Sequence, residues 1–453
     1  MKEKVIAIFD IGKTNKKILL FNYDLKVVSE TEQRFTEIAD DDEFPCEDIE
    51  RLEEWIRDNV NRLAKSEKYD LSAINFATYG ATLAFLDGSG KRITPVYNYL
   101  KPVDDKIPER IYKKYGGQDE FCRRTASPAL GMLNSGIQVL WLKHRKTGLF
   151  EKVKYILHFP QYLSYLLTGK IYSEHTSLGC HTALWDFDNM NYHPWTSAEG
   201  LELPDPVDIG TVEKVNIYGK NVSVGIGIHD SSSSLVPYFS ASKGKFILLS
   251  TGTWCINMNP FNSEILTTEQ LDLDCLCYLS ISQQPVKSSR LFLGHLHETA
   301  VDQLNNHFET DADYYKKVKP DTRILTDCMQ KRGNNRFFFD NLPYSRKLKT
   351  DCDYYTFKTF EEAYHQLMIE LTELTVEAID LILPVDDDIE NIYITGGFAD
   401  NQLFYTLISN AYPMKYVYTS EISNTTALGA AIVILKTIAP DNKPLLNLGL
   451  NRC

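Results

Sequence analysis

The segment from Val5 to Phe21 constrains the fold of this chain most strongly. An apolar, β-prone run ends at Asp10, a short polar turn follows, and a second apolar run begins at Ile18. This pattern predicts a β-hairpin with a polar turn. Gly12 in the turn permits a positive φ and a close approach of the backbone to a ligand.

The polar residues of this turn have the chemistry of a phosphate site. The side chains of Thr14 and Asn15, together with successive backbone N–H groups, can surround a phosphate, and Asp10 can hold a hydrated Mg²⁺. An ordinary hairpin with a polar turn fits the same residues equally well. The distinction depends on whether the rest of the chain repeats the arrangement.

Length and composition indicate a globular protein with two domains. The chain has 453 residues, of which 43% are hydrophobic and 24% are charged. Its net charge of −13 argues against nucleic acid and against an acidic membrane surface as partners. The first residues do not resemble a signal peptide, and no apolar run approaches the roughly 18 residues that a membrane helix requires. The nine scattered cysteines are typical of reduced thiols, so we expect a cytoplasmic protein. The expected oligomeric state is a monomer or a homodimer.

The first half of the chain alternates predicted strands and helices. One buried strand ends in Thr78, Tyr79 and Gly80, and ligands of open α/β sheets bind at such carboxyl ends. A charged run, residues 40–43, is predicted to be a solvated loop, and residues 171–195 a polar loop. Strands are predicted over residues 5–12, 16–22, 25–33 and 73–77, and helices over residues 47–65, 134–144 and 155–168.

The second half repeats the opening arrangement. Residues 246–254 are an apolar strand followed by a polar Gly-Thr turn and the start of another strand. We therefore expect two domains, residues 1–240 and residues 241–453, each built around one strand–turn–strand unit.

Two further strands of this half end in residues suited to a ligand site. The strand over residues 222–228 leads to His229 and Asp230 at a helix start, and the strand over residues 391–397 ends in a glycine pair. Asp400 is placed to cap the helix that follows the glycine pair.

Four motifs together resemble the FGGY family of carbohydrate kinases, and the resemblance spans nearly the whole chain. The segment Asp10–Asn15 resembles the first phosphate motif of that family, and Ser250–Trp254 resembles the second. Thr395–Gly397 with Asn401 resembles the adenosine motif. Gly227–Ser231 resembles the segment with the catalytic base, in the Gly-x-His-Asp form of the rhamnulokinase-like and fuculokinase-like branches.

The resemblance implies an α/β fold of two actin-like (ribonuclease H-like) ATPase domains, with a nucleotide and sugar cleft between them. It implies transfer of the γ-phosphate of ATP, with Mg²⁺, to a hydroxyl of a small sugar, such as the ketoses L-fuculose, L-rhamnulose and xylulose. Asp230 would be the general base, and Asp10 would hold Mg²⁺ through water. The residues implied to bind ATP are Gly12, Lys13, Thr14, Asn15, Gly252, Thr253, Gly396, Gly397 and Asn401.

Several of these assignments have an alternative. Asp230 also fits the N-cap of a helix, and Tyr79 also fits core packing. His229 could orient Asp230, contact the sugar or serve only the structure. The residues implied to line the sugar site are Thr78, Tyr79, Gly80, Asn98 and His229.

Two segments depart from the family pattern. Gln138 stands where members often have Lys, and Tyr97–Leu100 replaces a Trp-x-Asp-x-Arg type of segment near the sugar. These departures leave the identity of the sugar open, because related sugars are distinguished by a few contacts.

Two other hypotheses were weighed. An actin-like ATPase that acts as a sugar sensor, a chaperone or a filament subunit would share the fold without phosphorylating a sugar. His295 and His297 could suggest a metal site, but their i,i+2 spacing suits a strand rather than a zinc-binding helix, and no third ligand is evident.

Overall fold

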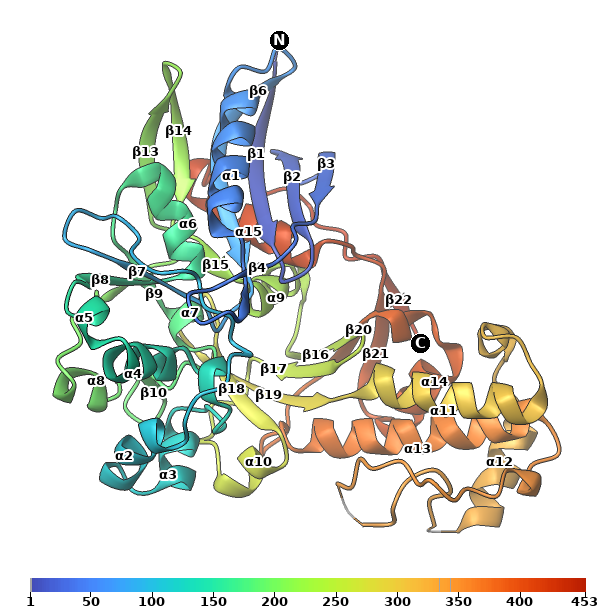
Figure 1. The fold of residues 1–453 in the computed structure, drawn as a ribbon. Coiled ribbons are helices and arrows are strands. Elements are labelled where there is room, and N and C mark those ends of the chain that lie inside the picture. Colours follow the sequence, from blue (N-terminus) through green and yellow to red (C-terminus); the bar gives the residue numbers. More distant parts are fainter. Residues whose placement is uncertain (1, 334, 343) are drawn as a thin grey trace.

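The computed structural model describes residues 2–333, 335–342 and 344–453. Within these residues, two seven-stranded sheets are each packed against helices (Figure 1). The first sheet contains the N-terminal strands, and the second is formed by the later part of the chain. This arrangement confirms the predicted α/β class with two sheet-containing halves.

The first sheet contains β1 (Glu3–Ile11), β2 (Lys16–Asn22), β3 (Val27–Gln33), β6 (Tyr69–Thr78), β13 (Val212–Ile217), β14 (Lys220–Gly225) and β15 (Ile228–His229). Its strand order is β13-β14-β6-β1-β2-β3, and β15 pairs with β6. The β1–β2 hairpin is antiparallel, whereas β6 runs parallel to β1, β14 and β15.

The second sheet contains β16 (Phe246–Thr251), β17 (Cys255–Asn259), β18 (Cys275–Leu279), β19 (Pro285–Leu291), β20 (Asn391–Gly396), β21 (Tyr416–Ser420) and β22 (Leu450–Arg452). Its order is β18-β19-β17-β16-β20-β21-β22. The series β3-β2-β1-β6-β14 and β19-β17-β16-β20-β21 each have two antiparallel pairs followed by two parallel pairs. The predicted repeat on the scale of half the chain is therefore confirmed.

Strand β1 is buried on both faces, which explains its nearly continuous apolar sequence. Val5, Ala7 and Phe9 lie in one core cluster with helices α1 (Ile49–Ala64) and α6 (Phe159–Thr168). The alternate residues Ile6 and Ile8 lie in a second cluster with α15 (Thr425–Ile438). Alternation along the strand thus places helices on both faces of the first sheet.

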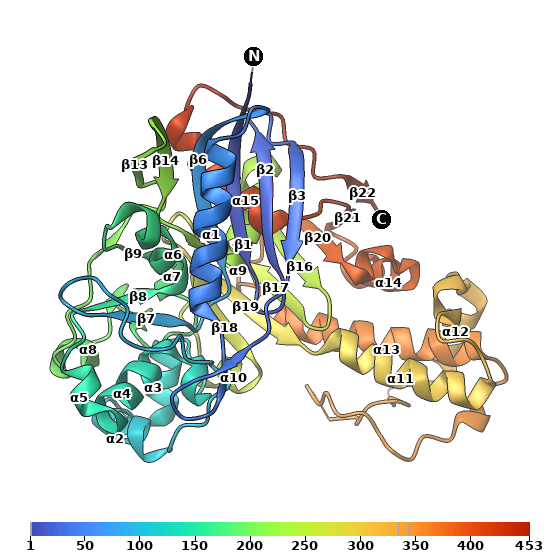
Figure 2. The same ribbon diagram turned by 45° about the horizontal axis from the view of Figure 1, so that its top comes forward.

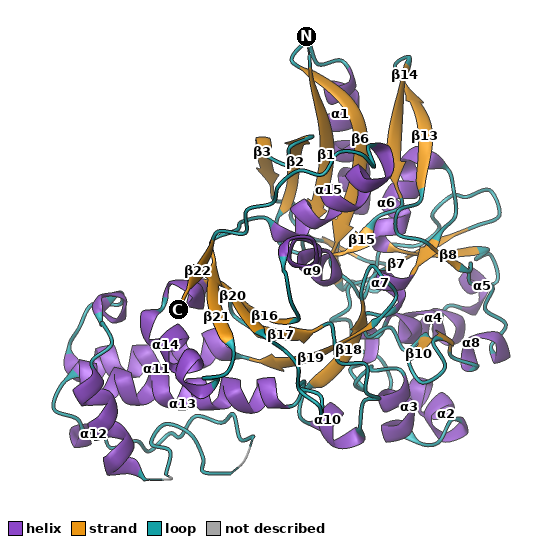
Figure 3. Cartoon of the chain, turned by 180° about the vertical axis from the view of Figure 1, so that it is seen from behind, coloured by secondary structure: helices purple, strands orange, loops and turns teal. Residues whose placement is uncertain are grey.

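The C-terminal helix α15 returns to the first sheet and packs against α9 (Asp230–Ala241), as Figure 3 shows. The contact is close because α15 has a glycine there: a Cβ at Gly429 would lie 1.9 Å from the carbonyl oxygen of Ser233. The hydroxyl of Ser233 donates to the carbonyl of Thr426 at 2.7 Å. The small residues of this helix therefore serve close packing. The domain boundary near residue 240 stays a prediction.

Two groups of helices extend the sheets. In Figure 2 the long helices α11 and α13 lie side by side and project away from the second sheet. The remaining helices of the first half are α2 (Lys106–Lys114), α3 (Gln118–Arg124), α4 (Ser135–Arg145), α5 (Thr147–Phe150), α7 (His175–Leu178) and α8 (Trp195–Ala198). Those of the second half are α10 (Thr268–Asp272), α11 (Leu293–Phe308), α12 (Thr322–Arg332), α13 (Phe360–Asp380) and α14 (Gln402–Ala411).

In the loops of the first half, short strands pair with one another. Their bounds are β4 (Ile38–Ala39), β5 (Pro45–Cys46), β7 (Leu83–Leu86), β8 (Tyr155–His158), β9 (Ser173–Glu174), β10 (Trp185–Asp186), β11 (Asn191–Tyr192) and β12 (Pro206–Val207).

Three local predictions were wrong. The helix predicted over residues 155–168 begins only at Phe159, because the first four residues pair with β7 as β8. The stretch 171–195 contains α7 and short strands rather than only loop. Asn401, not Asp400, caps α14, since its side chain accepts the N–H of Phe404.

In the described part of the chain, none of the helices combines the length and the apolar character needed to cross a membrane.

Candidate active site

Three strands of the first sheet end side by side, and this brings four predicted site residues together. Thr78 on β6 is in register with Ile11 on β1 and with His229 on β15. All three strands run parallel, so Asp10, Thr78 and His229 lie at one carboxyl edge, with Asp230 directly after His229. Carboxyl edges of this kind hold the ligands of open α/β sheets.

Asp10 and Asp230 lie close enough to influence each other. Burial, reinforced by the nearby carboxylate of Asp230, raises the pKa of Asp10 to about 7. Within the described residues, the Asp10 side chain makes no hydrogen bond, so its oxygens are available to a ligand. Two neighbouring carboxylates, one of them without a hydrogen bond, form a donor set that suits a hard divalent cation such as Mg²⁺.

The turn after β1 is closed by a backbone hydrogen bond in which Gly12 N–H donates to the Asn15 carbonyl at 2.9 Å. Thr14 is exposed at the tip. Lys13 forms an ion pair of 2.6 Å with Glu37, and the Asn15 side-chain oxygen accepts from Arg34.

A buried ion pair between Lys16 and Glu47 holds this turn in place. Lys16 is 1% exposed, its ammonium lies 2.9 Å from Glu47, and it also donates to the carbonyl of Lys13. The hydroxyl of Tyr79 donates to Glu47 at 3.3 Å, which ties the sugar-side residue Tyr79 to the phosphate turn. Sequence reasoning missed Glu47, because nothing local signals a partner so far along the chain.

His229 and Asp230 form a contact at the start of α9. The His229 Nε2 lies 3.2 Å from an Asp230 oxygen, and burial lowers the pKa of His229, so the ring is neutral at pH 7. The same Asp230 oxygen accepts the N–H of Ser231. Asp230 is the first residue of the helix and His229 its N-cap, so the predicted alternative of an Asp230 N-cap is not what the structure has.

A buried polar network fixes the strand that carries His229. The hydroxyl of Thr176 accepts the N–H of His229 at 3.1 Å and donates to Glu174 at 2.8 Å. The amide of Gln161 donates to the carbonyls of Ile226 and Gly227. These residues were not predicted as functional. Their partners lie some 50 to 65 residues away in sequence, so no local pattern could have revealed them.

Gly80 packs closely against His229 and Cys180. A Cβ at Gly80 would lie 3.0 Å from His229 Nε2 and 3.1 Å from Cys180 Sγ. Asn98 makes its hydrogen bonds with other parts of the chain. Its amide nitrogen donates to the Pro45 carbonyl at 3.0 Å, and its side-chain oxygen accepts the N–H of Leu100. Thr78 donates its hydroxyl to the carbonyl of Tyr79.

The second sheet presents the equivalent turn and the glycine pair side by side. β16 runs parallel to β20, with Thr251 in register with Gly396. Gly396 has φ +85°, and a Cβ there would lie 1.8 Å from the Thr251 carbonyl oxygen, so only glycine fits. A Cβ at Gly397, in contrast, would meet nothing within 4 Å. The Thr253 carbonyl accepts the N–H of Gly294 at the start of α11.

A cavity of about 520 Å³ lies beside the glycine pair. Its size suits a nucleoside. Asn401 belongs to its wall, but both ends of its amide are used: Nδ2 donates to Tyr364 at 2.8 Å and Oδ1 caps α14. The cavity is lined by Gly252, His297, Tyr315, Lys316, Val318, Lys319, Gly397, Phe398, Asp400, Asn401 and Gln402.

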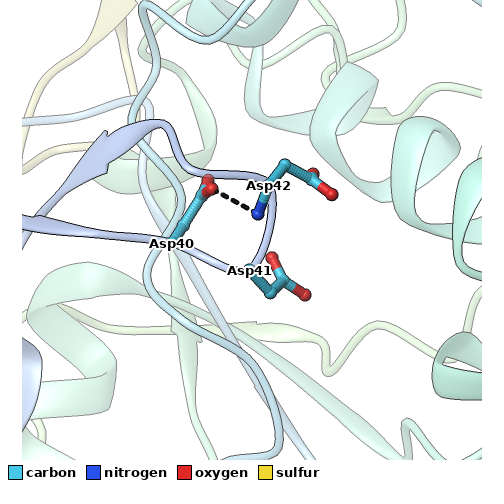
Figure 4. Close-up of side chains that lie close together, drawn as sticks. All are labelled: Asp40, Asp41 and Asp42. Carbon is cyan, nitrogen blue, oxygen red and sulfur yellow. Dashed lines mark hydrogen bonds between the residues drawn. The ribbon is translucent and has the colours of Figure 1, made fainter.

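The acidic run near the N-terminus is not a free metal site. Asp40, Asp41 and Asp42 lie close together (Figure 4), and their carboxylates could hold a metal ion. However, Lys101 lies 2.5 Å from Asp40 and 2.6 Å from Asp42, and Lys146 lies 2.6 Å from Asp41. The lysines already neutralise this cluster, and Asp40 is buried. The predicted solvated loop is confirmed for Asp41, Asp42 and Glu43, which are exposed, whereas Asp40 is buried against a distant lysine.

The two histidines of the weaker metal hypothesis lie on helix α11, not on a strand. His297 is buried and its Nε2 is 3.0 Å from the Tyr364 hydroxyl, whereas His295 stacks on Phe292. Among the described residues, neither belongs to a group of three potential metal ligands.

The two sheets of matching strand pattern, each with its own strand–turn–strand unit, and the nucleoside-sized cavity beside the glycine pair are features of the actin-like ATPase fold. Comparison with known proteins identifies the family. The N-terminal domain of the FGGY family of carbohydrate kinases matches residues 5–199, and the FGGY C-terminal domain matches residues 243–443. The chain belongs to this family, and it is therefore an ATP-dependent carbohydrate kinase.

Individual relatives agree with this family. A rhamnulokinase of Oceanobacillus iheyensis is 22% identical over 95% of this chain and 92% of that protein. Other rhamnulokinases match over about half of their own length. The crystal structure of a carbohydrate kinase from Novosphingobium aromaticivorans superposes with a TM-score of 0.82 at 23% identity, covering 100% of this chain and 94% of that chain. A ligand-bound xylulose kinase from Lactobacillus acidophilus gives 0.76 at 15% identity, covering 99% and 93%.

Gly397→Val should weaken ATP binding by roughly 10-fold or more, because a branched side chain would project into the cavity beside the glycine pair. Calorimetric titration with ATP measures the effect. Gly88→Val is the matched control, since a Cβ at this exposed turn also meets nothing within 4 Å. Equal ATP affinity in the Gly397 variant and the wild type would contradict the assignment.

Asp10→Asn should raise the melting temperature at neutral pH. Asp10 takes up a proton in the folded state between its ordinary pKa of 3.8 and about 7, so the stability it contributes is complete below pH 3.8 and lost as the pH rises through 7. Melting curves should therefore show a gap between variant and wild type that widens from pH 4 to pH 7 and then stays constant.

The exposed Asp24 provides the control for this experiment. Asp24→Asn measures the effect of removing one negative charge at an exposed site. A gap of the same size at pH 4 and pH 8 for the Asp10 variant would contradict the raised pKa of Asp10.

Proposed function

We propose that this kinase phosphorylates a small ketose, that Asp230 is the general base, and that Asp10 holds Mg²⁺. The observation that carries the proposal is the register of β1, β6 and β15, which brings the two carboxylates together at one strand edge, close to Gly80 and His229. The rhamnulokinase and xylulose kinase relatives support a ketose of the L-rhamnulose, L-fuculose or xylulose type.

Asp230 is suited to accept the proton of the attacking sugar hydroxyl. As the oxygen attacks the γ-phosphorus, its O–H bond breaks, the proton passes to the carboxylate, and ADP leaves with the electrons of the broken P–O bond. The neutral His229 ring beside Asp230 leaves the carboxylate its charge, and the N–H of Ser231 keeps one of its oxygens oriented.

Asp10, with Asp230 nearby, would hold the cation, which supplies charge neutralisation for the phosphates when bound. The phosphates would lie between the turn of Gly12, Lys13, Thr14 and Asn15 and the turn of Gly252 and Thr253. Backbone N–H groups and hydroxyls of these turns stabilise charge on the transferred group.

The nucleoside and the sugar would bind on opposite sides of these turns. Adenosine fits the cavity beside Gly396, Gly397 and Asn401, where the absent side chain of Gly397 leaves room. The sugar would contact Thr78, Tyr79, Gly80 and His229, with Asn98 shaping the outer wall through its fixed amide.

Two further parts of the proposal concern organisation and location. We assign residues 1–240 to the sugar-binding domain and 241–453 to the ATP-binding domain, while α15 completes the core of the first. Free thiols at Cys46, Cys122, Cys180, Cys255, Cys275, Cys277, Cys352 and Cys453 and the use of ATP support a cytoplasmic enzyme. Membership of a kinase family does not favour the alternative of a sensor, chaperone or filament protein.

The test is an ADP-release assay with Mg²⁺-ATP and L-rhamnulose, L-fuculose or xylulose. We expect ADP release only when one of these ketoses is present. L-Rhamnose, the aldose isomer of L-rhamnulose, is the matched control and should be turned over far more slowly. ADP release that does not depend on sugar would support the ATPase alternative, and equal turnover of L-rhamnose would contradict a ketose substrate.

A further inference from the structure

The segment Gly179–His181 lies where the two halves of the protein meet. A Cβ at Gly179 would lie 2.5 Å from the side chain of Leu279 on β18. The backbone of Gly179 therefore packs directly on a side chain of the second sheet. The next residue, Cys180, has its sulfur beside Gly80 of the sugar-side strand end. His181 therefore follows directly after a residue that touches the space we assign to the sugar.

His181 has a backbone conformation that a histidine rarely adopts. Its φ is +40°, in the left-handed region, and the loop is held there by two hydrogen bonds. The Thr182 hydroxyl donates to the Leu178 carbonyl at 2.6 Å, and the Thr182 carbonyl accepts the N–H of Gly136 at 2.7 Å. Strain of this kind persists at sites where a side chain must point in a required direction.

The ring of His181 has a defined tautomer. Its Nδ1 lies 3.1 Å from the carbonyl oxygen of Leu133, and a carbonyl only accepts, so Nδ1 carries the hydrogen. Burial, together with nearby His229, lowers the pKa of His181 to about 4, which keeps the ring neutral. Its Nε2 is thus an acceptor, and within the described residues the hydrogen bond recorded for the ring is the one made by Nδ1.

The groups around this ring belong to the catalytic edge. His229 and the Arg290 guanidinium, which comes from β19 of the second sheet, both act electrostatically on His181. Asp230 and Arg290 likewise act on the adjacent Cys180. Arg290 is itself held by Asp274 at 2.5 Å and lies over the Trp254 ring that follows the second phosphate turn. His181 therefore lies near charged groups from both the catalytic edge and the second sheet.

We propose that His181 Nε2 accepts a hydrogen bond from a sugar hydroxyl other than the one that Asp230 deprotonates, which makes His181 a specificity-determining residue. The inference rests on the proposed function. The contact with Leu133 alone does not explain a histidine, since asparagine supplies the same N–H and tolerates the left-handed backbone better. The acceptor at Nε2 is what distinguishes histidine at this position.

Two substitutions separate this role from a structural one. His181→Asn keeps a donor at the position of Nδ1 but has no atom at Nε2. His181→Gln has an oxygen near the position of Nε2 but nothing equivalent at Nδ1. We expect His181→Asn to raise KM for L-rhamnulose by about 10- to 100-fold, with KM for ATP unchanged, because a bound hydroxyl loses its acceptor. His181→Gln should recover much of the affinity.

His175→Gln is the matched control, because His175 lies in the same segment with its ring against Trp185. It should leave both KM values unchanged, and melting curves check that each variant is folded. A structural role predicts the reverse order, a normal Asn variant and an impaired Gln variant, and that order would overturn the proposal. Equal effects on the KM for L-rhamnulose and on the KM for ATP would also overturn the proposal. If the wild type turns over none of the three ketoses, the proposed substrate class is wrong and this inference falls with it.

Discussion

The parallel pairing of β6 with β1 on one side and with β15 on the other is the constraint on which the site depends. Backbone hydrogen bonds fix the register, so the ends of three strands meet although they are separated by some 65 to 150 residues of sequence. Asp10 and Asp230 are brought together as a consequence. Burial and the proximity of Asp230 raise the pKa of Asp10. The ionised form of Asp10 is therefore disfavoured in the folded protein without a cation.

Buried charge pairs hold the surrounding loops in place. The Lys16–Glu47 pair lies beneath the first phosphate turn, and the lysines Lys101 and Lys146 anchor the acidic run at Asp40. Each pair joins segments that are distant in sequence. Because removal of one partner would leave an uncompensated buried charge, these pairs specify loop positions more than they add stability. The sugar-side loops are therefore positioned before any ligand binds.

Much of the fold and of the candidate site could be predicted from the sequence. The hairpin at Asp10, its repeat at residues 246–254 and the strand that leads to Asp230 were all visible as apolar runs broken by polar turns. Such patterns are local, because side-chain alternation and turn residues act over a few positions. The family resemblance placed the motifs in one active site, and the register of the strands agrees with that placement.

The cap of α14 was assigned one residue too early, and the other features that local patterns missed involve partners that are distant in the chain. Residues 155–158 form a strand only because β7, some 70 residues earlier, offers them a hydrogen-bonding edge. The acidic loop is anchored by lysines about 60 to 100 residues away. His181 lay in a stretch predicted to be a polar loop, and its role depends on Leu133 and on neighbours from the second sheet. Local patterns carry no information about such contacts.

The central claim is that Asp230 acts as the general base at an edge shared with Asp10. The most direct measurement is the turnover of Asp230→Asn with Mg²⁺-ATP and the preferred ketose, with melting temperature and ATP affinity as controls. Asparagine has the same shape and can still accept the N–H of Ser231, so the fold and ATP binding should be preserved. The account predicts a loss of roughly 10²- to 10⁴-fold in kcat. Turnover within about threefold of the wild type would contradict it, because general-base catalysis contributes far more than that factor.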